Sequence, residues 1–170
     1  ADAKTQRKLI LVVCPTSVIF HWQELFKRFL PVANVLVFHG VQRNANQLEE
    51  DPEIVITSYG ILRSERAMFK RLRFTLSIFD EIQVAKNTNS LTHRALKMVQ
   101  SEMRLGLTGT PIENRLMDLK ALFDIVLPKY LPSDARFEQL FGYDANWEQD
   151  PKRKELLRQL IKPFLLRRRK

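Results

Sequence analysis

The 170-residue chain has a single cysteine, only five glycines and no long hydrophobic run. One thiol, Cys14, cannot form an internal disulfide, which excludes a disulfide-stapled scaffold and is typical of a reducing compartment. The three histidines (His21, His39, His93) lie far apart, so no zinc-ligand spacing is present. The longest uncharged run, residues 9–20, is too short to span a bilayer. We therefore expect no membrane partner.

The chain is basic, but unevenly so. Its composition, 45% hydrophobic and 28% charged residues, is ordinary for one globular domain of 20.0 kDa. The net charge is +9, and the last twenty residues hold nine of the 28 basic residues but only one of the 19 acidic ones. Residues 1–150 are therefore almost neutral, which excludes a uniformly basic nucleic-acid-binding surface.

Short apolar runs alternate with amphipathic segments along the first 127 residues, and this alternation predicts a parallel α/β sheet. Beyond residue 128 the signals are only helical or irregular. We expect Ser17 to cap the first helix and four of that helix's aromatic residues (Phe20, Trp22, Phe26, Phe29) to be core. The predicted strands are 9–13, 35–38, 54–57, 74–79 and 103–107, and the later helices are 59–70, 91–99 and 116–126.

Polar sequences follow four of the predicted strands, at the carboxyl edge where ligands of such sheets bind. Asp80 at the end of a buried strand can hold Mg²⁺, and Glu81 beside it can polarise water for attack on a γ-phosphate. An ordinary acidic turn is the alternative interpretation of this pair, as helix capping is for the hydroxyl motifs. The four sequences are Pro15–Ser17, Thr57–Tyr59, Asp80–Gln83 and Thr108–Pro111.

A phosphate-binding loop of the form G-x-x-x-x-G-K-[ST] occurs nowhere in the 170 residues. The carboxylate pair therefore lacks, within this sequence, a cradle for the nucleotide that Mg²⁺ would accompany. The glycines are Gly40, Gly60, Gly106, Gly109 and Gly142.

Taken in order, these segments resemble the Swi/Snf family of helicase-related, DNA-stimulated ATPases, from about Leu9 to the C-terminus. Leu11–Trp22 resembles its motif Ia, Ile54–Leu62 motif Ib, Asp80–Asn87 motif II, Leu107–Leu119 motif III, and Ile161–Lys170 the sequence that closes the first lobe. The resemblance implies a three-layer RecA-like fold of the P-loop NTPase type. This fold has a parallel sheet with helices on both faces and a helical C-terminal extension. Its first phosphate-loop strand is absent here.

The resemblance also implies roles for individual residues. Asp80 would coordinate Mg²⁺, directly or through water, Glu81 would act as the base, and Gln83 would complete the catalytic set. Thr108, Gly109 and Thr110 would couple the nucleotide state to lobe movement. The expected contacts to the backbone of double-stranded DNA, independent of sequence, are Pro15, Thr16, Ser17, Thr57, Ser58, Lys86 and Asn87.

On this interpretation the chain is part of an ATP-dependent DNA translocase or chromatin-remodelling-type helicase that uses ATP and Mg²⁺. Residues 1–127 would form a partial first lobe, and residues 128–170 would lead to a second RecA-like lobe. We expect the isolated chain neither to bind Mg·ATP tightly nor to hydrolyse it. A non-catalytic DNA- or protein-binding module with the same fold is the alternative. Compact spacing between motifs II and III favours a bacterial, cytoplasmic protein over a nuclear one.

The resemblance further suggests that the absent strand would lie between the strands ending at Asp80 and Thr108. A hole there would leave backbone groups unpaired. We therefore expect rearranged pairing, a segment that fills the gap, or an oligomer formed through the unpaired strand edges.

Overall fold

The computed structural model describes residues 8–109, 116–142 and 150–166. Within these ranges five strands form one sheet in the order β2-β3-β1-β4-β5, and every pairing is parallel. Each predicted strand is present within a few residues of its predicted bounds. The strands are β1 (Ile10–Cys14), β2 (Val35–Val37), β3 (Ile54–Ser58), β4 (Arg73–Asp80) and β5 (Gln100–Leu107).

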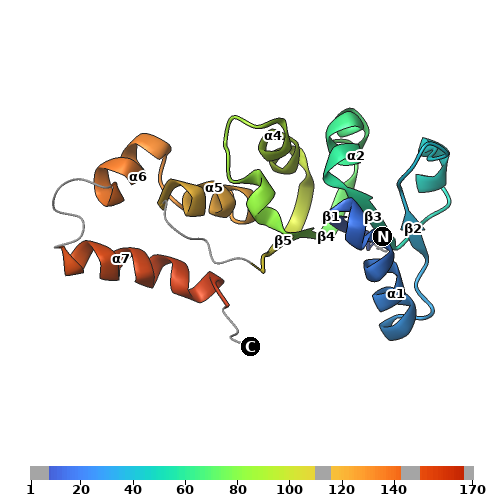
Figure 1. Ribbon diagram of the computed structural model, residues 1–170, viewed down its shortest axis with the longest axis horizontal. Helices are drawn as coiled ribbons and strands as arrows, with labels where there is room; N and C mark the ends of the chain where they lie inside the picture. The colour runs from blue at the N-terminus through green and yellow to red at the C-terminus, as the bar shows by residue number, and fades with distance from the viewer. Residues whose placement is uncertain (1–7, 110–115, 143–149, 167–170) are drawn as a thin grey trace, which may run out of the picture.

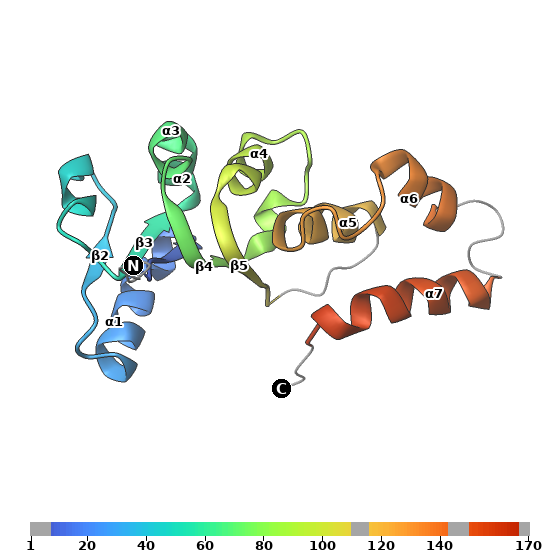
Figure 2. The same ribbon diagram turned by 180° about the vertical axis from the view of Figure 1, so that it is seen from behind.

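Helices pack on both faces of this sheet (Figures 1 and 2). Alternate residues of β1 point to opposite sides: Val12 and Cys14 join one hydrophobic cluster with α1, and Leu11 and Val13 join the cluster under α2, α3 and α4. The predicted three-layer parallel fold is confirmed. The helices are α1 (Ile19–Phe29), α2 (Tyr59–Ser64), α3 (Arg66–Phe69) and α4 (Leu91–Met98), with 3-10 turns η1 (Thr16–Val18), η2 (Ala45–Leu48) and η3 (Ile82–Ala85).

The helices after β5 extend away from the sheet (Figure 1). They build a third hydrophobic cluster around Phe123, Phe137 and Phe141, whereas Leu122 and Ile125 of α5 belong to the cluster under α2, α3 and α4. Since α5 contributes to both clusters, a division near residue 127 stays a prediction. These elements are α5 (Leu116–Val126), α6 (Asp134–Phe141), α7 (Pro151–Ile161) and η5 (Lys162–Phe164).

The buried Lys120 ties α6 to α5 through ion pairs. Lys120 Nζ lies 2.5 Å from Asp124 Oδ2 and 2.6 Å from Asp134 Oδ1. Burial alone would lower the pKa of Lys120, but the hydrogen bonds to the two carboxylates outweigh it, and the pKa lies above its ordinary value. Lys120 is therefore a charged, paired side chain in the core.

The expected gap in the sheet is not there. β4 and β5 pair directly with each other, from Arg73 opposite Gln100 to Asp80 opposite Leu107. The prediction of a missing strand between them is wrong, because the two strands satisfy each other's backbone groups over their whole length. The free edge on this side is instead the outer edge of β5.

Two expectations about the helices are also corrected. Ser17 does not cap α1: it lies inside η1, and α1 begins after Val18 with no side-chain cap. Trp22 packs against the cluster, but Phe20 and Phe29 are 68% and 66% exposed and are not core. Phe20 points about half a turn away from Trp22, and Phe29 is the last residue of the helix.

Close packing at Gly106 brings η3 and α5 against β5. A Cβ atom at this position would lie 2.9 Å from Ile82 Cδ1 and 3.2 Å from Val126 Cγ1. At Gly60 in α2 the nearest atom would be Ser58 Oγ, at 3.8 Å.

We expect Gly106→Ala to lower the free energy of unfolding by about 1–3 kcal/mol, because the added methyl group overpacks this contact. The matched change Gly60→Ala replaces a helical glycine at a position where the added methyl group has no close neighbour. It should raise the free energy of unfolding by about 0.5–1 kcal/mol. Urea denaturation of both variants measures this difference. Equal effects would contradict the packing described.

Candidate functional site

The carboxyl ends of the strands meet at one edge, as the register requires. Cys14 at the end of β1 lies opposite Ser58, Val13 lies opposite Phe79, and Asp80 lies opposite Leu107. The residues that follow these strand ends are therefore brought together: Pro15–Ser17, Tyr59, Asp80–Gln83 and Thr108–Gly109. Thr110 and Pro111, which belong to the same predicted motif, lie outside the described residues.

Asp80 is held by three hydrogen-bond donors. Its Oδ2 accepts from Trp22 Nε1 at 2.9 Å, and its Oδ1 accepts from the Glu81 amide at 3.0 Å. Its main-chain carbonyl accepts from Tyr59 Oη at 2.6 Å. Burial and then the nearby Asp80 charge raise the pKa of Tyr59, so the phenol stays protonated and donates. Both the backbone and the carboxylate of Asp80 are thus fixed.

Glu81 has a left-handed backbone, with φ 51° and ψ 48°, at the sharp turn from β4 into η3. This conformation is uncommon for a residue with a side chain. The Glu81 carboxylate accepts hydrogen bonds from Gln83 Nε2 at 2.6 Å and from the Gly109 amide at 3.4 Å. Glu81 therefore joins the end of β4 to the loop after β5.

The acidic pair fits Mg²⁺ only as part of a larger ligand set. No group of three or more His, Cys, Asp or Glu side chains that could hold a metal occurs in the described ranges. Each carboxylate oxygen of Asp80 accepts one hydrogen bond and retains a second lone pair. Mg²⁺ usually binds one or two carboxylates together with water and substrate phosphates. The residues suit such a site and not a closed, all-protein one.

The hydroxyl residues expected to contact DNA divide into two groups. Thr57 and Ser58 are buried: Thr57 Oγ1 donates to the Phe38 carbonyl at 2.9 Å, and Ser58 Oγ accepts from the Ile61 amide at 3.3 Å, which caps α2. Their hydroxyls are occupied within the fold. Thr16 and Ser17, in contrast, are exposed on η1, after a half-buried Pro15.

Lys86 and Asn87 are exposed on the turn that follows η3. Lys86 Nζ lies 3.3 Å from Asp118 Oδ2 of α5, and Asn87 Oδ1 accepts from the Asn89 amide at 2.9 Å. This turn therefore presents a partly neutralised cation and an amide group to solvent.

Sequence reasoning missed two residues of this site. Trp22 was expected only as a core residue, and Tyr59 only as part of a hydroxyl motif, yet each donates a hydrogen bond to Asp80. The usable signal was weak: a Trp or Tyr that is mostly buried normally has a partner for its N–H or O–H group. The sequence does not say which partner.

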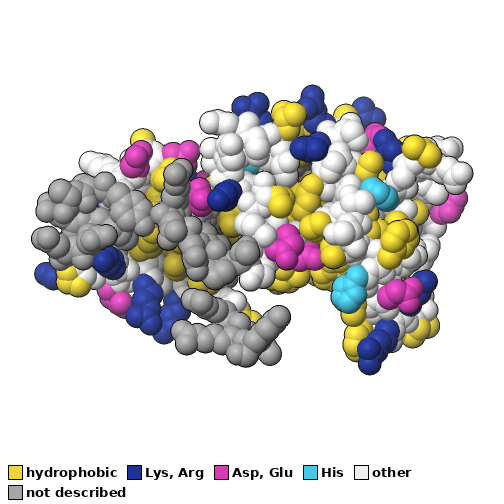
Figure 3. All heavy atoms as spheres, in the orientation of Figure 1, with side chains coloured by type: hydrophobic (Ala, Val, Ile, Leu, Met, Phe, Trp, Pro, Cys, Tyr) yellow, Lys and Arg dark blue, Asp and Glu magenta, His cyan; other side chains and the backbone are white. Residues whose placement is uncertain are grey.

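A cavity of about 890 Å³ opens beside the acidic pair. Asp80 and Gly109 line its polar end, and the exposed side chains Met103 and Leu105 of β5 line its apolar side with residues 164–166. Acidic side chains gather among hydrophobic atoms near the middle of one face, whereas Lys and Arg gather along the side of α2 and α4 (Figure 3). The space beside Asp80 thus continues along the free edge of β5.

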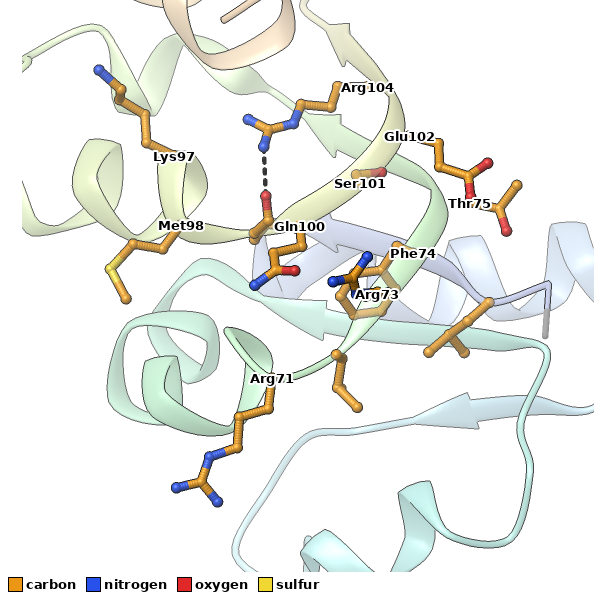
Figure 4. Close-up of a pocket in the computed structure, with 13 residues that line it drawn as sticks. Arg71, Arg73, Phe74, Thr75, Lys97, Met98, Gln100, Ser101, Glu102 and Arg104 are labelled. Atoms are coloured by element: carbon orange, nitrogen blue, oxygen red, sulfur yellow. Dashed lines mark hydrogen bonds between the residues drawn. The ribbon is translucent and has the colours of Figure 1, made fainter. Parts of the chain in front are cut away.

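A second cavity, of about 690 Å³, lies at the amino-terminal ends of β4 and β5. It is lined by Arg71, Arg73, Lys97 and Arg104 (Figure 4). Arg104 hydrogen bonds to the Val99 and Ile125 carbonyls. Lys97 stands in the last turn of α4, where a cation interacts favourably with the last carbonyls. This cavity is separated from Asp80 by the length of β4, about 25 Å, and Arg104 and Lys97 have local structural reasons for their charge.

The parallel sheet and the acidic pair at the carboxyl ends of its strands define a RecA-like ATPase-core architecture. Comparisons with known proteins agree. The structure superposes with a TM-score of 0.85 on the Sulfolobus solfataricus SWI2/SNF2 ATPase core in complex with dsDNA. The two are 34% identical, over 96% of this chain and 34% of that one. The same core solved as the ATPase core domain gives a TM-score of 0.78 at 33% identity.

The sequence model of the SNF2-related domain matches residues 1–170, and the chain belongs to this family. It is 35% identical to an uncharacterized ATP-dependent helicase of Mycoplasma genitalium, over 94% of this chain and 15% of the relative. It is 30% identical to the TATA-binding protein-associated factor MOT1 of Saccharomyces cerevisiae, over 94% of this chain and 9% of the relative. The chain thus spans a small part of these relatives. In the described residues no helix is long and apolar enough to cross a membrane.

The reactivity of Cys14, at the end of β1, tests whether the carboxyl ends of the strands are packed as described. Burial, with a further contribution from the Asp80 charge, raises the pKa of its thiol to about 12. Because the thiolate is the reactive form, we expect iodoacetamide at pH 8 to alkylate the native chain at least about a hundredfold more slowly than the chain in urea. Mass spectrometry follows the single cysteine without ambiguity. Equal rates would show that Cys14 is exposed to solvent in the native chain and that the carboxyl ends of the strands are not packed as described.

Proposed function

We propose that this chain is the first RecA-like lobe of a longer ATP-dependent DNA translocase, and that its carboxyl edge hydrolyses ATP. The observation that carries the proposal is the fixed acidic pair: Asp80 is held by three donors, and Glu81 is held by Gln83 and Gly109. The similarity to ATP-dependent helicases and to a SWI2/SNF2 ATPase core supports it.

In this mechanism Asp80 holds Mg²⁺, directly or through water, with its remaining lone pairs. The ion, when bound, supplies charge neutralisation on the phosphates. Glu81 accepts the proton of the water that attacks the γ-phosphate. Gln83, 2.6 Å from the Glu81 carboxylate, keeps this base in position. Thr108 and Gly109, together with Thr110 beyond the described residues, couple this edge to movement of a second lobe.

The nucleotide-binding part of the site lies outside these 170 residues in our proposal, since they contain no phosphate-binding loop. A further strand of the longer protein covers the free edge of β5, where Met103 and Leu105 are 60% and 41% exposed. Pairing of two copies of the chain is the other way to cover this free edge of β5. The chain alone does not hydrolyse ATP. Residues 128–170 lead towards the second lobe, and we place the protein in the bacterial cytoplasm.

The proposed second substrate is the phosphate backbone of double-stranded DNA, bound without sequence preference. The exposed Thr16, Ser17, Lys86 and Asn87 supply neutral and cationic donors of the kind that contact phosphates. Thr57 and Ser58 support this surface from within the fold. The dsDNA in the similar Sulfolobus solfataricus structure supports a DNA partner.

Replacing the proposed base tests the catalytic part. In the longer protein, Glu81→Gln should lower the DNA-stimulated ATPase rate by about 10²–10⁴-fold and leave ATP binding intact, because only proton transfer is lost. Glu24→Gln is the matched control, since Glu24 is an exposed residue of α1 that pairs with Lys27. A parent protein without ATPase activity in the presence of DNA would favour the non-catalytic binding module.

The DNA contacts have a separate test. Thr16→Ala combined with Ser17→Ala removes two exposed hydroxyls and should weaken binding to any duplex by about 0.5–1.5 kcal/mol per lost contact. Thr57→Val removes a buried hydroxyl and should lower thermal stability while DNA affinity at fixed salt stays the same. Fluorescence anisotropy with two unrelated duplexes measures affinity. The reverse pattern would place the DNA at Thr57.

A further inference from the structure

One segment that we propose to contact DNA, and one buried segment that supports this surface, lead directly to hydrogen bonds with Asp80. η1, which carries Thr16 and Ser17, runs without a break into α1, and Trp22 lies in the first turn of that helix. Tyr59 is the first residue of α2 and directly follows Ser58. Trp22 therefore connects the exposed segment η1 to Asp80, and Tyr59 connects the buried Thr57–Ser58 segment to the same residue.

The two hydrogen bonds constrain different parts of Asp80. The Trp22 indole N–H, 2.9 Å from Oδ2, sets the rotation of the carboxylate, while the Glu81 amide holds the other oxygen. The Tyr59 hydroxyl, 2.6 Å from the carbonyl, fixes the backbone at the end of β4. Since both donors stand on stiff aromatic rings, a displacement of η1 or of the start of α2 changes the donor positions at Asp80.

From this arrangement, which rests on the proposed function, we infer that Trp22 and Tyr59 are positioning residues. They link the occupancy of the DNA-contacting segment η1, and of the buried Thr57–Ser58 segment beneath the same surface, to the orientation of the Asp80 carboxylate. Neither residue touches substrate in this role. The consequence is that DNA stimulates hydrolysis by shifting an Asp80 carboxylate that these donors already hold, and that the two hydrogen bonds carry this effect.

The Trp22 hydrogen bond is testable without any activity measurement. The chain has two tryptophans, so Trp147→Phe leaves Trp22 as the only indole in the 170-residue chain. Solvent exchange of its Nε1–H, followed by ¹H–¹⁵N NMR, should be about tenfold faster after Asp80→Ala, because a hydrogen bond to a carboxylate is lost. Indistinguishable exchange rates would overturn the inference.

The linkage itself is tested in the longer ATPase with two variants that keep the aromatic rings. Tyr59→Phe removes only the hydroxyl, and Trp22→3-benzothienylalanine replaces the indole N–H by sulfur. Each should lower the ratio of ATPase rates with and without DNA by about tenfold. The DNA concentration at half-maximal rate should change less than about twofold.

Tyr130→Phe is the matched control, since Tyr130 Oη donates to the Leu160 carbonyl at 2.9 Å, far along the chain from the acidic pair. It should keep the full stimulation ratio. An unchanged ratio in both test variants, or an effect confined to the DNA concentration required, would refute the linkage. If Glu81→Gln abolishes hydrolysis while both variants keep full stimulation, the proposed function stands and this inference alone fails.

Discussion

The pairing of β4 with β1 on one side and with β5 on the other fixes the carboxyl edge. β4 is eight residues long, and Phe74 and Phe79 on it are buried. Ile78 packs on the α1 side of the sheet and Phe79 on the side of α2 to α4, so a slip of one residue would exchange these side chains between the faces and break two ladders at once. The apolar pattern of β4 therefore determines where the strand ends, and its last residue is Asp80. The hydrogen bonds to the acidic pair are therefore made at a strand end whose position the sheet already fixes.

The residue after β4 adopts a conformation that the chain alone would avoid. A left-handed backbone at Glu81 costs about 1–2 kcal/mol. The surroundings offset this cost: Ile82 is buried against β5 at Gly106, and Gln83 and Gly109 bind the Glu81 carboxylate. The strain directs the second carboxylate away from the strand axis. Gly106 thus contributes to the site through packing, although it carries no functional group.

Much of this fold is readable from local pattern, because buried parallel strands are short apolar runs and the polar residues after them share one edge. Asp80 and Glu81 are found in this way. Contacts between distant segments are not, and Trp22 reaches Asp80 across 58 positions. The wrong expectation of a strand between β4 and β5 came from the family resemblance, and the periodicity of the sequence could not correct it, since periodicity does not specify strand order. Phe20 and Phe29 failed as core residues because an apolar residue on a helix need not face the sheet.

The donors around the acidic pair are all neutral. Trp22, Gln83 and two backbone amides hold the carboxylates in place, Tyr59 holds the Asp80 carbonyl, and within the described ranges neither acid has a Lys or Arg partner. An arginine would orient a carboxylate equally well, but it would also neutralise the charge. Neutral donors fix the geometry and leave the negative charge for a cation from outside. On the face that Figure 3 shows, the coloured Lys and Arg side chains gather along the side of α2 and α4 and leave the acidic side chains near its middle for that cation.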